Sequence, residues 1–244
     1  MICLLSYYQS PAQDYRYQMD NIEKVYIVAN TSIILKAHSD PQLVIPSPEN
    51  KRVQRKDTAK GATSGQDNTG FNVFVEKVRR TLNIESLQPR FADPLIIYLP
   101  ETIKVSVENR FHTDIRISGL SSEIEVKADH GDVILENVTG PLIVDCGHGK
   151  TSVNFSEVNQ QSPMSIVNSH GVIDVTIPAE TNADIELSVP RGELNSEFEL
   201  EGVGIDQQGF KTGRTSANLT SKLNGGGVSI MIFSSWGDVF IRKK

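Results

Sequence analysis

The sequence has little of what most recognisable functional sites require. It contains two cysteines, Cys3 and Cys146, which are too few for a disulfide framework and lack the spacing of a metal-binding cluster. It has one tryptophan, and aromatic residues make up 7% of the chain, so ring platforms for sugars are few. No apolar run approaches the ~20 residues that a transmembrane helix needs. These shortages exclude a small disulfide-stapled domain and a membrane-spanning helix within this sequence.

Basic residues are outnumbered by acidic ones. The chain carries 24 Lys and Arg residues against 30 Asp and Glu residues, which gives a formal net charge of −6. A nucleic-acid-binding protein needs a basic face to neutralise phosphates, so the sequence predicts no nucleic-acid partner. One dense basic run extends from Lys51 to Lys60 within a polar stretch. Such a run is typical of a solvated loop, and a basic docking patch is the alternative.

Helical periodicity is almost absent, and short alternating or β-branched runs recur between turn residues. This pattern is typical of strands and predicts an all-β fold. The stretch from Ser47 to Gly70 interrupts it, because it is rich in Gly, Ser and Thr and nearly free of apolar residues. We expect a long exposed loop at residues 47–70. Cys146 falls in a strand-like run and is predicted to be a small buried core residue.

The first residues form an N-terminal tail of a different character. "MICLLSYYQSPAQ" has a short apolar piece followed by small residues near Ala12, like the end of a secretory signal peptide. An ordinary terminus is the alternative interpretation. The domain organisation that we predict is a tail at residues 1–20, with a possible signal-peptide remnant, and one β-solenoid domain at residues 21–244.

A repeat dominates the second half of the chain. Histidine recurs before a corner at intervals of 18, 18 and 22 residues, at His112, His130, His148 and His170. Arg191 and Trp236 continue the pattern, each directly before a glycine. Each interval holds two strand-length runs and two turns, which is the content of one short two-strand coil. The sequence therefore predicts a single-stranded β-solenoid, or β-helix-like stack, with a period of about 18–22 residues.

Alternation within the repeat predicts which side chains face the core. In the coil that begins after His130, the inward set is Val133, Leu135, Val138, Leu142 and Val144. Asp132, Ile134, Glu136 and Asp145 are expected to face outward. The same reasoning extends the inward set to Val153, Phe155, Ile166, Val172 or Ile173, Val175 and Ile177.

The amino-acid sequences of the repeats resemble those of a known family. "HGDVILENVTGPLIVDCGHG", "NSHGVIDVTIP", "PLIIYLP" and "WGDVFIRKK" are similar to repeats of the bacterial putative-adhesin family of β-solenoid envelope proteins. The resemblance covers about residues 22–244 and is strongest from Pro94 onward. It implies a non-catalytic structural or binding module that is secreted or held in the cell envelope of a bacterium. The family has no agreed catalytic residues, so none is carried over. Surface glycans or envelope proteins are the partners that it suggests.

The corner histidines allow a sharper hypothesis. If they occupy equivalent corners, their rings stack at about the ~4.8 Å strand separation. Such a ladder could hold a metal ion through His112, His130, His148 and His170. We favour a plain corner role, because Arg191 and Trp236 share the position and neither is a metal ligand. The sequence thus predicts no metal and no cofactor. In either case, like-charge repulsion between stacked imidazoles should lower their pKa values.

An enzyme is the leading alternative. A carbohydrate-binding or carbohydrate-cleaving β-helix protein would gather carboxylates on one face, with a basic residue nearby. The candidates are Asp114, Asp132, Glu136 and Asp174, with Lys150 or Arg191. Their spacing singles out no pair, and outward acidic residues are the usual way to solvate a sheet. The sequence contains no G-x-S-x-G, H-E-x-x-H or P-loop motif. We therefore predict no catalytic residues, with an intracellular sensor or scaffold as a third possibility.

Overall fold

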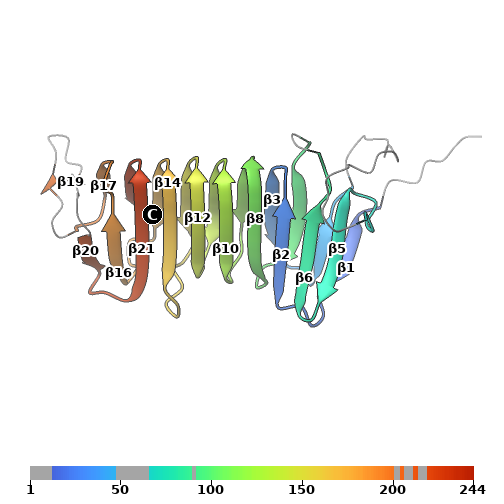
Figure 1. Ribbon diagram of the computed structural model, residues 1–244. Helices are drawn as coiled ribbons and strands as arrows, with labels where there is room; N and C mark the ends of the chain where they lie inside the picture. Colours follow the sequence, from blue (N-terminus) through green and yellow to red (C-terminus); the bar gives the residue numbers. More distant parts are fainter. Residues whose placement is uncertain (1–12, 48–65, 90–91, 201–203, 206–210, 214–218) are drawn as a thin grey trace, which may run out of the picture.

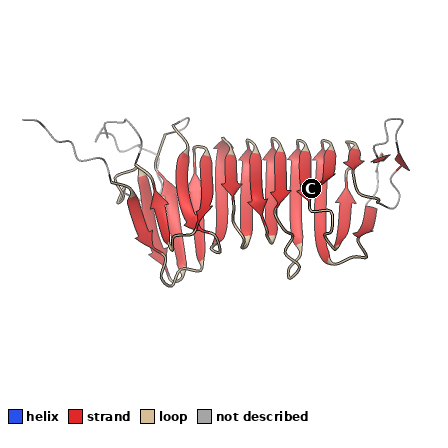
Figure 2. Cartoon of the chain, turned by 180° about the vertical axis from the view of Figure 1, so that it is seen from behind, coloured by secondary structure: helices blue, strands red, loops and turns tan. Residues whose placement is uncertain are grey.

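The computed structural model describes residues 13–47, 66–89, 92–200, 204–205, 211–213 and 219–244. Within these ranges the chain forms 22 strands in two large mixed sheets and no helix (Figures 1 and 2). The predicted all-β class is therefore confirmed. A search of the described residues finds no helix that is long and apolar enough to cross a membrane. Cys3 and the basic run from Lys51 to Lys60 lie outside the described residues.

The strands of the two sheets follow in their spatial order. Sheet A contains β1 (Tyr15–Gln18), β4 (Gln42–Ile45), β7 (Leu95–Pro100), β3 (Ile33–His38), β9 (Ile115–Ser118), β11 (Val133–Val138), β13 (Thr151–Phe155), β15 (Ile173–Ile177), β22 (Val239–Lys243), β17 (Leu194–Ser196), β19 (Lys211–Gly213) and β18 (Gly204–Ile205). Sheet B contains β20 (Leu219–Leu223), β16 (Ala183–Ser188), β21 (Val228–Trp236), β14 (Met164–His170), β12 (Leu142–His148), β10 (Ile124–His130), β8 (Lys104–His112), β2 (Lys24–Ala29), β6 (Thr81–Ser86) and β5 (Val73–Val78).

In the middle of the molecule the chain alternates between the sheets. β8, β10, β12 and β14 lie side by side in sheet B, and β9, β11, β13 and β15 lie side by side in sheet A. All of these neighbours are parallel. The register pairs His112 with His130, His130 with His148 and His148 with His170. The interval between successive histidines is therefore one passage through both sheets, which we call a coil.

The core lies between the two sheets and follows the predicted alternation. Val133, Leu135, Val138, Leu142 and Val144 are each at most 1% exposed. The other predicted inward residues are also buried, and Ile173 rather than Val172 takes the inward position. Of the residues expected outside, none is buried. Cys146 is fully buried, as predicted. Because inward positions carry Val, Ile and Leu in every coil, stacked coils share one continuous apolar layer.

Glycine follows three of the four corner histidines because of the corner backbone, and Thr113 follows His112. Gly131 and Gly149 have φ of +100° and +122°, a region that side chains with a Cβ rarely adopt. A Cβ on Gly149 would also collide with the carbonyl group of Gly131 in the preceding coil. The His-Gly dipeptide thus lets successive corners approach each other at the spacing of neighbouring strands.

The coils at both ends stack out of sequence order. The coil of β21 and β22 lies between that of β14 and β15 and that of β16 and β17 (Figure 1). Trp236 is therefore the direct neighbour of His170, although Arg191 comes first in the sequence. At the other end, the coil of β2 and β3 lies between that of β6 and β7 and that of β8 and β9. Coils of equal width and equal apolar lining can exchange places in this way.

Antiparallel strands finish both ends of the stack. β5, β1 and β4 do so at one end, and β20, β19 and β18 at the other. β1 lies within the predicted tail at residues 1–20 and pairs with β4. Most of the predicted loop, at residues 48–65, lies outside the described residues. The predicted domain boundaries remain a prediction.

Candidate functional site

A column of planar side chains runs along one corner of the stack. From one end to the other, the column consists of Arg191, Trp236, His170, His148, His130 and His112. The ring centroids of neighbouring histidines are 4.0, 4.5 and 4.6 Å apart, close to the expected strand spacing. The Trp236 ring lies 6.4 Å from that of His170 at an interplanar angle of 8°. The guanidinium of Arg191 stands 4.1 Å over the other face of Trp236. We call this set the corner column.

The corner column presents ring edges rather than ring faces to solvent. His130, His148 and His170 are stacked within 6° of parallel, so each ring covers the face of the next. Trp236 is 51% exposed, yet Arg191 and His170 flank its two faces. A sugar ring normally stacks on an open aromatic face, so the column is a poor sugar platform. Parallel rings also point their nitrogen atoms in parallel directions, which does not surround one metal ion.

Stacking changes the acid–base behaviour at the middle of the column. Partial desolvation lowers the pKa of His130, and the neighbouring charges of His112 and His148 lower it further. Asp129 acts in the opposite direction. This direction agrees with the expected like-charge repulsion. The neutral imidazole is therefore the form that the folded column favours at His130.

Buried polar side chains hold the corner backbone from inside. Asn168 donates through Nδ2 to the carbonyl of Gly149 at 2.7 Å and contacts Oγ1 of Thr151 at 3.0 Å. Ser234 donates to the carbonyl of Gly237 at 3.0 Å. At the His112 corner, Nδ2 of Asn109 contacts the carbonyl and the hydroxyl of Thr113. These bonds satisfy carbonyls that leave the strand ladder at each corner, so the column rests on a rigid base.

The carboxylates of the enzyme alternative are engaged in the structure of the coils. Oδ1 of Asp114 accepts from the backbone N–H of Asp132, and Oδ1 of Asp132 accepts from that of Lys150. Asp174 forms ion pairs with Lys150 at 3.3 Å and with Arg242 at 2.8 Å. Glu136 is exposed on β11. Each of these groups therefore links neighbouring coils or faces solvent. Among the described residues, no set of three or more His, Cys, Asp or Glu side chains is arranged to hold a metal ion.

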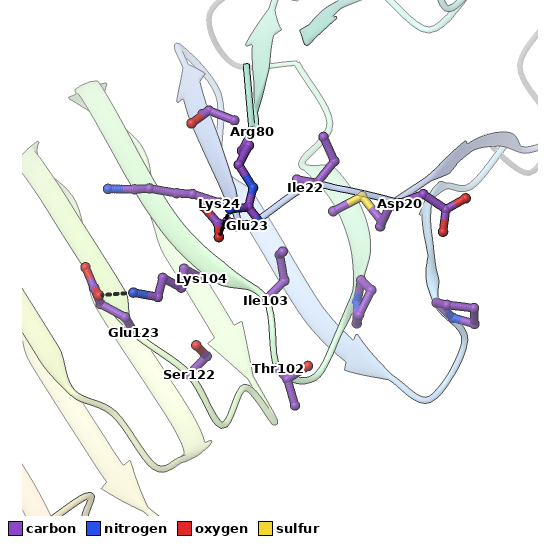
Figure 3. A pocket seen from close by; sticks show the side chains of 14 residues that line it. Asp20, Ile22, Glu23, Lys24, Arg80, Thr102, Ile103, Lys104, Ser122 and Glu123 are labelled. Atoms are coloured by element: carbon purple, nitrogen blue, oxygen red, sulfur yellow. Dashed lines mark hydrogen bonds and ion pairs between the residues drawn. The ribbon is translucent and has the colours of Figure 1, made fainter. Parts of the chain in front are cut away.

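A pocket of about 740 Å³ opens at the opposite ends of the sheet B strands (Figure 3). Its walls come from the starts of β2, β6 and β8 and from the turns before β4, β8 and β10. The column lies where β8 ends, at His112, whereas Lys104 lines the pocket where β8 begins. Nine residues of extended strand span roughly 25–30 Å, so the two features are far apart. The pocket volume is within the range of small-ligand sites.

The pocket combines an apolar floor with paired charges. Ile22 and Ile103 are buried beneath it. Arg80 pairs with Glu23 at 2.7 Å, and Lys104 pairs with Glu123 at 3.1 Å (Figure 3). The hydroxyls of Thr81, Thr102 and Ser122 also line the pocket. Such a lining can donate and accept hydrogen bonds from a polar, uncharged ligand.

A third ion pair flanks the pocket. Lys24 contacts Glu125 at 3.0 Å, and this bond lowers the pKa of the Glu125 carboxyl, with a smaller contribution from Ser106. The carboxylates of Glu23, Glu123 and Glu125 therefore each face a cation. A general acid needs a raised pKa, and Glu125 has the opposite shift.

Sequence reasoning did not find this pocket. Its residues come from segments between Met19 and Glu123 and share no motif or regular spacing. The only available signal was the group of charged residues at strand starts, at Lys24, Lys104 and Glu123, and such residues are common on any solvated sheet. In contrast, the regular interval of the histidines led directly to the corner column.

The sequence matches no family model and no curated protein. Two solved structures resemble the chain over 95% of its length. One is a putative cell adhesion protein from Clostridium sporogenes ATCC 15579, with 10% identity, a TM-score of 0.43 and 99% of that chain covered. The other is a putative adhesin from Bacteroides fragilis NCTC 9343, with 14% identity, a TM-score of 0.39 and 96% of that chain covered.

Proposed function

We propose that this protein is a non-catalytic, adhesin-like binding module built as a β-solenoid. We propose that the protein is held in the bacterial cell envelope or secreted from the cell. The sequences of the repeats from Pro94 onward support membership of the adhesin family. The passage of the chain back and forth between two sheets of parallel strands supports a β-solenoid. Its ligands are polar and uncharged, such as surface glycans.

The pocket of about 740 Å³ at the strand starts is the observation that carries this proposal. It offers an apolar floor and hydroxyls, and two of its three carboxylates, Glu23 and Glu123, each pair with a cation, whereas Asp20 is the third. Sugars are bound in proteins by networks of this kind, in which fixed charged pairs donate to and accept from hydroxyl groups. A glycan seated there would lie across the ends of several coils, on a rigid scaffold.

The test is a glycan array with the purified protein, run with and without EDTA. We expect saturable binding to particular neutral glycans that EDTA leaves unchanged, because the hydroxyls and ion pairs of the pocket would make the contacts. Binding that EDTA abolishes would contradict this site and support the metal ladder of the corner histidines. A blank array would contradict a glycan ligand.

Three variants then locate the binding. Thr102→Trp fills the pocket from an exposed turn, and we expect it to weaken binding at least tenfold. Thr220→Trp makes the same change on exposed β20 and should leave binding unchanged. Trp236→Ala should also leave it unchanged, since the faces of Trp236 are covered. Loss of binding in Trp236→Ala alone would move the site to the corner column.

A carbohydrate-cleaving enzyme is separated from this proposal by its product. Each glycan that binds is incubated with the protein, and new reducing ends are measured over a day. We expect none. Product formation that Asp174→Asn or Glu123→Gln abolishes would instead support a carbohydrate-cleaving enzyme.

A further inference from the structure

Among the described residues, sheet B ends at β5 (Val73–Val78), whose one strand neighbour there is β6. An edge strand normally leaves a row of backbone N–H and C=O groups open to another strand. Val75 lies opposite Ile84 in the antiparallel pair. Because bonded and non-bonded pairs alternate in such a ladder, one set of β5 groups points to β6 and the other set points outward.

Three of the outward groups of β5, the N–H and carbonyl of Val75 and the carbonyl of Val73, are occupied by side chains from the segment just before it. Asn68 donates through Nδ2 to the carbonyl of Val75 at 2.8 Å and accepts through Oδ1 from the N–H of Val75 at 2.9 Å. Thr69 donates its hydroxyl to the carbonyl of Val73 at 2.9 Å. The carboxamide of Asn68 therefore makes the two bonds that one residue of a neighbouring strand would make.

A carboxylate holds this segment in shape. Asp67 accepts from the backbone N–H groups of Thr69 and Gly70 at 2.9 Å and of Asn72 at 3.1 Å. The Thr69 hydroxyl also lies 3.0 Å from Oδ1 of Asp67, so its single proton is shared between that oxygen and the Val73 carbonyl. Burial opposes ionisation of Asp67, but these hydrogen bonds prevail and lower its pKa. The end of this segment is held next to β6, because the N–H of Leu87 donates to the carbonyl of Asn72 at 2.8 Å.

We propose that Asn68 and Thr69 form an edge guard that occupies the strand-pairing groups of β5 and so prevents a second copy of this chain from adding its own β5 to sheet B. At Val75, the backbone hydrogen bonds that a further strand would make are replaced by hydrogen bonds to the side chain of Asn68, which offers no strand edge of its own. Sheet B cannot grow past that point while the guard is in place.

A second β5 fits the unguarded edge by symmetry. A two-fold axis at Val75 would pair its N–H and C=O with those of Val75 in the other copy, as in an isologous antiparallel dimer. Glu76 would then face Phe74 of the second copy, and Lys77 would face Val73. No like charges stand directly opposite each other, so the charges of β5 do not oppose this pairing.

The experiment removes the guard from the full-length chain. In Asn68→Ala/Thr69→Val, sedimentation velocity over a hundredfold range of concentration should show a concentration-dependent species of twice the wild-type mass. Asn83→Ala/Thr176→Val makes the same chemical changes on outward positions of β6 and β15, and should behave as wild type. Unchanged mass in the guard variant at all concentrations would overturn the proposal.

Hydrogen exchange shows which edge has paired. The Val75 amide should exchange at least tenfold faster in the dilute guard variant than in wild type, and slowly again in its dimer. A dimer that protects β20 (Leu219–Leu223) and leaves Val75 open would contradict pairing through β5. If circular dichroism shows that the double variant has lost its strands, the single variant Asn68→Asp replaces it in the sedimentation experiment. It keeps an acceptor for the N–H of Val75, loses the donor and sets a carboxylate charge beside the Val75 carbonyl, so the guard is weakened and the variant should dimerise partially.

Discussion

At the scale of single residues, the corner column depends on the register of parallel strands. In a parallel ladder each residue lies beside its equivalent in the next coil, so one repeated residue type becomes a stack. His130, His148 and His170 follow this rule, and Trp236 extends it from a distant part of the sequence. Arg191 completes the stack, where a guanidinium over an indole is a favourable contact.

Protonation of the column should weaken the fold at acidic pH. The pKa of His130 is lowered in the folded state, so below the unfolded value of about 6.5 the unfolded chain binds more protons. The stabilising contribution is complete above that value and is lost as the pH falls through the folded pKa. In urea unfolding, we expect His130→Gln to reduce the loss of stability between pH 8 and pH 5.

A matched change tests whether this effect belongs to the column. His38→Gln removes an imidazole that binds the Gln42 carbonyl outside the column, so it controls for the general effect of replacing a histidine by glutamine. A nuclear magnetic resonance titration that finds an ordinary pKa for His130 would contradict the argument, whatever the unfolding data show.

At the scale of elements, the corner where the chain passes from sheet B to sheet A restricts which residue types can occupy it. The chain must reverse direction within a strand spacing, and the carbonyl of one corner lies against the α-carbon of the next. Buried Asn168 and Ser234 satisfy corner carbonyls from inside. The His148 and Trp236 corners therefore each combine a glycine on the tight side with a small polar residue beneath it.

Gly149→Ala should destabilise the fold more than Gly225→Ala. Both glycines have positive φ, so each change carries a strain of about 1–2 kcal/mol. A Cβ at Gly149 meets the Gly131 carbonyl, whereas nothing lies within 4 Å of a Cβ at Gly225. We expect Gly149→Ala to cost a further ~1–3 kcal/mol, measured by urea unfolding. Equal losses in the two variants would show that the corners can move apart.

At the scale of the whole molecule, two coils are enclosed between coils that are not all their neighbours in sequence. The coil of β21 and β22 is the last in sequence, yet it has a coil on each side. The coil of β2 and β3 is enclosed in the same way at the other end. The final segment of the chain thus completes the ladder after the coils around it have been synthesised.

Removing the last coil should open the stack from within. A chain that ends at Gly227 lacks β21 and β22, so β14 and β16 each lose a parallel neighbour. We expect amide exchange to become fast from Ala183 to Ser196, with partial loss at β14 and β15. Persistence of full protection at β16 and β17 would mean that these strands have paired directly with β14 and β15.

The sequence by itself determined the local properties of this protein. Its alternation predicted the strands and the buried set from Val133 to Val144, and its intervals predicted that His112, His130, His148 and His170 are aligned. These properties depend on neighbours along the chain and on a period that repeats. Burial of Cys146 follows from the same alternation.

Only the tertiary structure decided the order of the outer coils, the pocket and the edge guard. All coils have nearly the same apolar lining, so no local pattern says that Trp236 rather than Arg191 follows His170. The pocket joins segments from Met19 to Glu123, and their proximity depends on where the coil of β2 was inserted. Asn68 looks like any loop residue until β5 is placed at the edge of sheet B. Interchangeable repeats leave such choices to long-range packing, which short-range sequence patterns do not encode.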